Sequence, residues 1–140
     1  MSKLQIQIGS SEHIQISLPT KMIGDANTFI GKAKVHVSSL ACSQHVQISK
    51  ADLSLFFTGV ERAYKTLKGE FTLASASTLP SGSDGFVVTG RMTRRGHVKV
   101  TVVVRGRRFQ QPDDTEWKAE ASFSFEPDRL NRILDVRHLT

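Results

Sequence analysis

Apolar and polar residues alternate one by one along most of this chain, a period that is typical of half-buried β-strands. The alternation is clearest over residues 97–105, where four valines at even positions share one face, and over residues 117–126. Shorter stretches of the same pattern predict further strands at residues 4–8, 14–18, 34–37, 41–48, 71–73 and 86–93.

The segment at residues 50–67 follows the period of a helix instead. Its apolar residues fall on one helical face: Leu53, Phe56, Phe57, Val60, Tyr64 and Leu67. Ser49 is the predicted N-cap, Asp52 suits the positive end of the helix, and Gly69 is placed to end it. A second, short helix is predicted after Pro127, with a stripe of apolar residues on one side: Leu130, Ile133 and Leu134.

These elements predict an α+β fold in one domain over residues 1–140. We expect about seven or eight strands in a single curved antiparallel sheet, a meander, because the connections are short and the alternation is clean. The sheet packs on the central helix at about residues 50–67, and a short helix lies at the C-terminus. The length suits one domain, and residues 75–85 and 110–115 have the composition of loops.

The expected cellular compartment follows from the absence of membrane spans, secretory signals and disulfides. No apolar run approaches the ~18 residues needed to span a bilayer, so we expect no membrane partner. Residues 1–9 alternate in polarity and lack the apolar core of a secretory signal. Cys42 is the single cysteine, which excludes an internal disulfide and a multi-cysteine zinc site. We therefore expect a cytoplasmic protein.

Catalytic patterns are scarce. The chain has no phosphate-binding glycine loop, no HExxH and no GxSxG. Cys42 with His36 or His45 is the one candidate nucleophile pair, but His45 lies three residues away and would point to the opposite strand face. A small core residue is the favoured interpretation of Cys42. The histidines lack metal-ligand spacing, so we expect no metal site. Because catalytic patterns are scarce, we also expect no catalytic residues and no cofactor. The protein is therefore not expected to be an enzyme.

The net charge of +6 is concentrated in one segment. Residues 86–111 hold seven of the 19 Lys and Arg residues and no acid, which leaves 12 basic against 13 acidic residues elsewhere. The Arg94-Arg95-Gly96 segment predicts a hairpin turn between two of the strands there. We define the basic hairpin as Arg91, Arg94, Arg95, His97, Lys99, Arg105, Arg107 and Arg108, and predict that it binds a partner.

Three interpretations of the basic hairpin remain. It can be a solvated face whose charges protect sheet edges from aggregation. It can bind the phosphates of a nucleic acid, although only Phe109 is a candidate for stacking on bases, and helix-turn-helix, RNA-recognition and zinc-finger patterns are absent. We favour the third, a protein partner with an acidic contact surface, because Arg is enriched at interfaces and binds carboxylates in bidentate fashion.

The order of short motifs points to a family. The helix LSLFFTGVERAYKTLKG leads into GEFTLAS, followed by DGFVVTGRM, RGHVKVTVVVR, Trp117, ASFSF and EPDRL. In this order, over residues 30–134, the chain resembles the WapI-like immunity proteins of bacterial polymorphic toxin systems. Gly96-His97-Val98 is the best matching element, whereas Tyr64 stands where many relatives carry Trp.

The resemblance implies a cytoplasmic inhibitor without enzymatic activity, which binds the C-terminal effector domain of a cognate toxin and blocks it. Family members neutralise different toxins, so the toxin's chemistry is not implied. Inhibitors of nucleases usually need acidic surfaces, and a basic hairpin therefore favours a toxin with an acidic contact surface. The alternative function is a module that binds nucleic acid or another acidic ligand through residues 91–108.

Overall fold

The computed structural model describes residues 3–19, 28–38, 40–75, 85–107 and 116–137, and it confirms the α+β class. Four strands come first: β1 (Lys3–Gly9), β2 (His13–Pro19), β3 (Thr28–Val37) and β4 (Leu40–Ser49). After helix α1 (Lys50–Thr66) follow four more: β5 (Glu70–Ala74), β6 (Phe86–Met92), β7 (Val98–Arg107) and β8 (Glu116–Phe125). A 3₁₀ turn, η1 (Pro127–Arg129), and helix α2 (Leu130–Leu134) come last.

The described strands form two sheets, which corrects the expectation of a single curved one. Antiparallel neighbours in chain order give the sheets β1-β2-β3-β4 and β5-β6-β7-β8. Alternation shows which face of a strand is buried, but it does not show where one sheet ends and the next begins. Helix α1 separates β4 from β5 along the chain, and each set of four strands forms a meander of its own.

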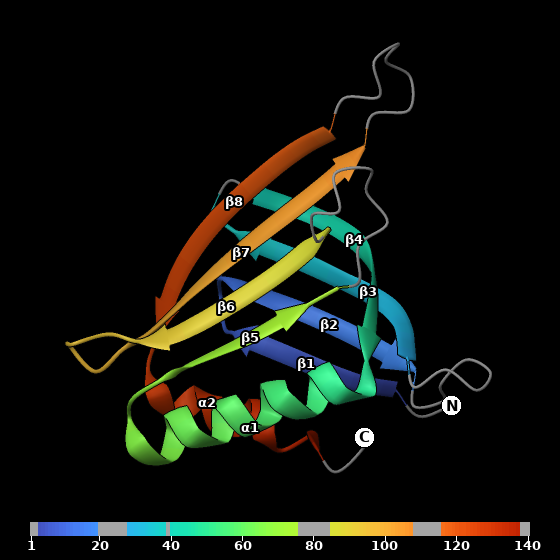
Figure 1. Ribbon diagram of the computed structural model, residues 1–140. Coiled ribbons are helices and arrows are strands. Elements are labelled where there is room, and N and C mark those ends of the chain that lie inside the picture. The colour runs from blue at the N-terminus through green and yellow to red at the C-terminus, as the bar shows by residue number, and fades with distance from the viewer. Residues whose placement is uncertain (1–2, 20–27, 39, 76–84, 108–115, 138–140) are drawn as a thin grey trace.

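The two sheets lie one in front of the other and share one hydrophobic core (Figure 1). Ile6 and Ile16 are fully buried from the first sheet, and Phe86, Val100 and Val102 from the second. These residues occupy alternate positions in their strands, as the sequence predicts. The polar residues that alternate with these buried residues form the outer faces of the two sheets. The side chains accessible for binding are therefore on these faces, at the hairpin ends or on the helices.

Helix α1 begins as predicted. The Asp52 N–H donates to Ser49 Oγ at 3.0 Å, which makes Ser49 the N-cap. The helix ends earlier than expected, because Leu67 takes a left-handed conformation (φ +56°) and its N–H bonds the Ala63 carbonyl. Leu67 is therefore 57% exposed instead of lying on the buried face.

The two helices cover one side of the sandwich (Figure 1). Helix α1 packs along β5, and α2 packs against α1 and β1. Leu130 and Ile133 of α2 are buried, as the apolar stripe predicts. Neither helix is long and apolar enough to cross a membrane.

Candidate functional site

The predicted hairpin turn is present and well ordered by hydrogen bonds. Strands β6 and β7 pair from Phe86–Val104 to Met92–Val98. Beyond this ladder, the Thr93 N–H donates to the His97 carbonyl at 2.8 Å, and the Gly96 N–H donates to the Thr93 carbonyl at 3.0 Å. Gly96 adopts φ +80°, a conformation that favours glycine. The turn therefore holds the two arginines before Gly96 at its apex.

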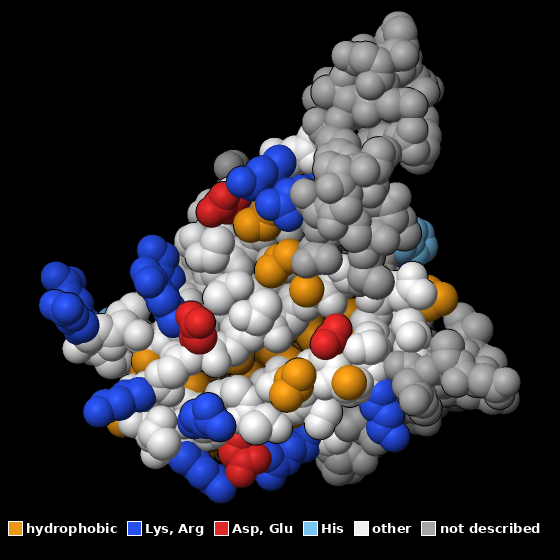
Figure 2. Space-filling view, in the orientation of Figure 1, with side chains coloured by type: hydrophobic (Ala, Val, Ile, Leu, Met, Phe, Trp, Pro, Cys, Tyr) orange, Lys and Arg blue, Asp and Glu red, His pale blue; other side chains and the backbone are white. Residues whose placement is uncertain are grey.

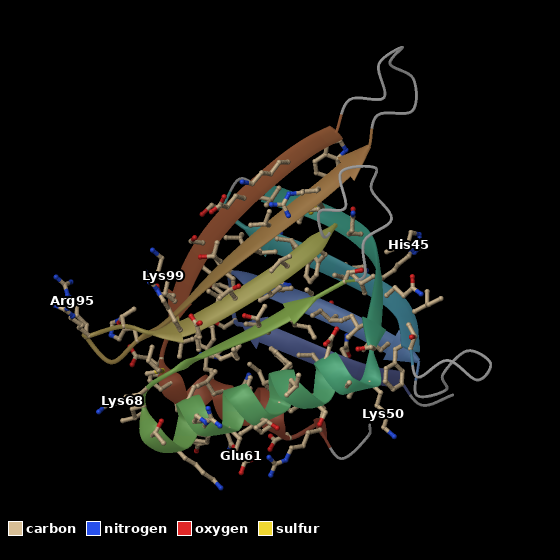
Figure 3. All side chains as sticks on the ribbon, in the orientation of Figure 1. His45, Lys50, Glu61, Lys68, Arg95 and Lys99 are labelled. Carbon is tan, nitrogen blue, oxygen red and sulfur yellow. The ribbon has the colours of Figure 1, made fainter. Side chains whose placement is uncertain are left out.

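Arg94 and Arg95 project from the body of the protein. Both are exposed, and Figure 3 shows Arg95 at the far end of the hairpin, beyond the ends of the neighbouring strands. Neither side chain forms a hydrogen bond or ion pair with another residue of the described ranges. Arg91 and Lys99 stand opposite each other at the base of the hairpin, on the outer face of the second sheet. We call Arg91, Arg94, Arg95 and Lys99 the basic tip.

The other described members of the basic hairpin lie at the far end of β7 or next to an acid. Arg105 lies six residues from Lys99 along β7, or about 20 Å, and stands opposite Lys118. His97 has a carboxylate nearby, since its Nε2 is 3.4 Å from Glu126 Oε1. Arg107 ends β7 with only its backbone described, and Arg108 lies outside the described residues. A count of charged residues along the sequence does not show how far the strand separates the basic tip from Arg105 and Arg107.

Lys68 was missed by sequence reasoning, because it lies more than 20 residues before the basic tip. The pairing of β5 with β6 places it at the hairpin base, where the Met92 N–H donates to the Gly69 carbonyl at 3.2 Å. Figure 3 shows Lys68 just below the hairpin, and Figure 2 shows basic side chains gathered at this end of the molecule. Glu70 stands opposite Arg91 and is the nearest acid in the pairing.

A row of hydroxyl side chains lies next to the tip on the same outer face. Thr72, Thr89, Thr101 and Ser122 are register partners across all four strands. The hydroxyls of Thr101 and Ser122 are 3.1 Å apart. Short side chains in one row make this part of the sheet low and even, a shape that suits contact with a flat protein surface. Only the register reveals the row, since its members are scattered along the sequence.

A second basic surface lies on the outer face of the first sheet. Its members are His13, Lys32, Lys34, His36 and His45, and strands β1 to β4 contain no Asp or Glu. The rings of His13 and His36 stack with centroids 5.7 Å apart. Within the described ranges, no three His, Cys, Asp or Glu residues are placed to hold a metal ion. Sequence reasoning missed this surface because its charges are spread over three strands.

The candidate nucleophile pair is not assembled. Cys42 stands opposite Val35 on the inner face of β4, whereas His36 and His45 are exposed on the outer face. Partial burial raises the pKa of the Cys42 thiol, which disfavours the reactive thiolate. Cys42 was expected to be a small core residue, and it lies at the margin of the core, partly buried and packed against it.

Comparisons with known proteins were made for the whole chain. No family model, no curated protein and no solved structure matches it. Of the motifs quoted above, RGHVKV leads from the hairpin turn into β7, and EPDRL opens η1.

An ion-pair cluster fastens the C-terminal segment to α1. The Glu61 carboxylate accepts from Lys65 Nζ at 2.8 Å and from the Arg137 guanidinium. The hydrogen bond from Lys65, followed by that from Arg137, holds the pKa of Glu61 below its ordinary value of 4.5. Arg137 follows α2, so the cluster ties the end of the described chain to the helix that covers β5.

This cluster predicts an acid-sensitive part of the stability. A carboxyl whose pKa is lower in the folded state stabilises the fold above its unfolded pKa, and this contribution is lost as the pH falls through the folded pKa. We expect Glu61→Gln to be less stable than the parent protein at pH 7 and to lose less stability below pH 4.5. Urea unfolding of both proteins at pH 7 and at acid pH measures this, and parallel losses would contradict it.

Proposed function

We propose that this chain is an immunity protein that binds a cognate toxin domain and neutralises it by covering it, without catalysis. The observation that carries the proposal is the basic tip, a hydrogen-bonded hairpin end that holds Arg94 and Arg95 away from the body of the protein. Guanidinium groups held in this way keep their charge and their donors available for a partner. The motif resemblance supplies the class of partner.

Charge favours a partner with an acidic contact surface. Lys68 lies next to the basic tip at the hairpin base. Two acids are close to this region: Glu70 stands opposite Arg91, and Glu126 contacts His97. A positive surface raises the rate of encounter with a negative one and fixes the orientation of docking. An acidic cleft on the toxin, such as one with catalytic carboxylates, is the complement we expect.

The tip alone is too small to form the whole interface. A stable protein–protein contact buries about 800 Å² on each partner. The even hydroxyl row of Thr72, Thr89, Thr101 and Ser122 extends the surface from the tip across the second sheet. We propose that the tip enters the acidic site of the toxin while this row covers its rim, which would exclude substrate by occlusion.

Nucleic acid is the alternative partner, and the described aromatic residues of the second sheet argue against it, whereas Phe109, the candidate for stacking, lies outside the described residues. Binding of single strands usually adds exposed aromatic side chains on which bases stack. Phe71 and Phe86 of the second sheet point into the core. On the described outer face of that sheet, the side chains are hydroxyl, aliphatic or charged.

The test is a pair of matched charge reversals. Arg94→Glu/Arg95→Glu alters the tip, and Lys32→Glu/Lys34→Glu alters the basic surface of the first sheet, so each variant lowers the net charge from +6 to +2. With the toxin domain encoded beside this protein as the partner, we expect the tip variant to associate about tenfold more slowly. The control should stay within about twofold of the parent protein, and high salt should reduce the difference.

Each outcome has a distinct meaning. Equal effects of both variants would show that only the overall charge matters and would contradict docking through the tip. Unchanged association of the tip variant would remove the tip from the interface. Recovery of nucleic acid instead of the toxin domain, lost at high salt, would support the alternative function.

A further inference from the structure

Among the strands that the structure describes, the outer edge of β8 has no pairing partner. Of the four edge strands, β5 is covered by α1, whose Gly59 lies against the Glu70 carbonyl, and β1 has α2 beside it. On β4, the Gln47 N–H donates to Ser75 Oγ at 2.8 Å. Within the described residues, β8 contacts β3 and β4 of the first sheet, but no strand other than β7 is hydrogen-bonded to it (Figure 1). Its ten residues contain no proline, and their pairing with β7 has no bulge.

The hydrogen-bond pattern shows which backbone groups this edge presents. The Arg105 N–H donates to the Gly85 carbonyl and the Thr93 N–H to the His97 carbonyl, so the odd residues of β7 bond to β6. In an antiparallel ladder the bonding direction alternates, and the even residues of β7 therefore bond to the odd residues of β8. The even residues of β8 direct their N–H and C=O groups away from the sheet: Lys118, Glu120, Ser122 and Ser124.

We propose that two copies of this chain pair through this edge, with the two β8 strands antiparallel and a two-fold axis at Ser122. The pairing joins the second sheets of both copies into one continuous sheet of eight strands. An unprotected edge is a template for such addition, and the backbone supplies its hydrogen bonds.

Charge selects this register among the alternatives. Pairing centred on Ser122 places Lys118 opposite Glu126 of the second copy, and Glu126 opposite the second copy's Lys118. A shift that centres the pairing on Ala121 places Glu116 opposite Glu126, and a shift to Phe123 places Glu120 opposite Glu126. Opposite charges across a strand pair stabilise it, and like charges destabilise it.

The inner face of the strand fits the same register. Ala121 stands opposite Phe123 of the second copy, and Ala119 opposite the second copy's Phe125, so each small side chain faces a large one. These are non-hydrogen-bonded pairs, in which side chains approach most closely. Trp117, Ala121 and Phe125 are only partly buried in the single chain. A second copy would cover the side of these residues that the core leaves open.

This pairing goes beyond the proposed function and shares only Ser122 of the hydroxyl row with it. It uses neither Arg94 nor Arg95, and the antiparallel arrangement points the two hairpins in opposite directions along the joined sheet. The two proposals are distinguished by their variants: reversal of Arg94 and Arg95 tests toxin binding, and the β8 variants, measured without toxin, test self-association.

The test is Ser122→Pro, with Ser122→Ala as its matched control. Proline removes an N–H that points away from β7, and edge strands tolerate it in that position. Alanine removes the same hydroxyl but keeps the N–H. In sedimentation equilibrium we expect the parent protein and Ser122→Ala to approach twice the chain mass of 15.5 kDa with rising concentration. Ser122→Pro should remain at the single mass with an unchanged circular dichroism spectrum.

A charge swap tests the register and the identity of the partner, and it does not depend on how the proline variant folds. Lys118→Glu and Glu126→Lys should each weaken self-association about tenfold, and the double variant should restore it. A parent protein that stays at 15.5 kDa up to about 200 μM would overturn the proposal, since an unblocked edge of this length would pair by then. A folded Ser122→Pro dimer would overturn pairing through β8, and a dimer indifferent to the charge variants would overturn the Ser122 register.

Discussion

Phe56→Ala is expected to lower the free energy of unfolding by about 3–5 kcal/mol, the usual loss when a fully buried aromatic ring is truncated. Phe56 is inaccessible to solvent at the contact between α1 and the second sheet. Its ring lies 5.5 Å from that of Phe57 and meets the Phe71 ring edge-on at 5.7 Å. Urea unfolding followed by the fluorescence of the single tryptophan, Trp117, measures the change.

The neighbouring residue provides the control. Leu55 is 70% exposed, so Leu55→Ala should change stability by no more than about 0.5 kcal/mol. The two substitutions remove apolar side chains from adjacent positions of one helix and differ mainly in burial. Comparable losses would contradict the orientation of α1 on the sheet.

Gly90→Ala is expected to destabilise the second sheet by about 1–3 kcal/mol, because the added methyl group has no room. Gly90 stands opposite Phe71, whose ring lies across it. A Cβ at Gly90 would come within 2.2 Å of Phe71 Cζ, far closer than carbon atoms approach without a shift. The ring is 3% exposed and cannot move away into solvent.

A double-mutant cycle identifies the ring as the cause. With Phe71→Leu as background, the smaller side chain leaves space, and Gly90→Ala should cost less than it does in the parent protein. Gly85→Ala is the matched control, because its Cβ would meet the Arg105 carbonyl oxygen at an ordinary 3.6 Å. An equal cost of Gly90→Ala in both backgrounds would show that backbone effects, and not the ring, cause the loss.

The sequence predicted individual elements better than their assembly. Alternation correctly assigned the buried faces of β7 and β8, and the Ser49 cap marked the start of α1, since both signals depend on near neighbours in the chain. The division into two sheets depends on which strands pair, and no residue in the eight strands encodes this locally. The end of α1 was misplaced because Leu67 is apolar and continues the helical stripe, although it forms the cap.

In the candidate site too, the sequence predicted local features better than contacts between distant segments. The Arg94-Arg95-Gly96 segment predicted the hairpin turn and its two arginines, since sequence neighbours remain spatial neighbours in a turn. Lys68 and the hydroxyl row became visible only with the pairing of β5, β6 and β7. The alternation placed Arg105 on the same strand face as Lys99, and the length of β7, about 30 Å for ten residues, puts the two side chains toward opposite ends of the strand.

The two arginine side chains at the apex of the β6–β7 hairpin take no part in holding the described fold together. Arg94, Arg95 and Gly96 are exposed, and no atom lies within 4 Å of where a Cβ of Gly96 would be. The residues that shape the molecule and those that present charge are thus different sets. If the tip binds a partner as proposed, substitutions at Arg94 and Arg95 can accumulate without loss of folding, so natural selection can retune recognition at two codons while the rest of the gene stays constant. A lineage that faces a changing adversary could keep pace through this hairpin alone.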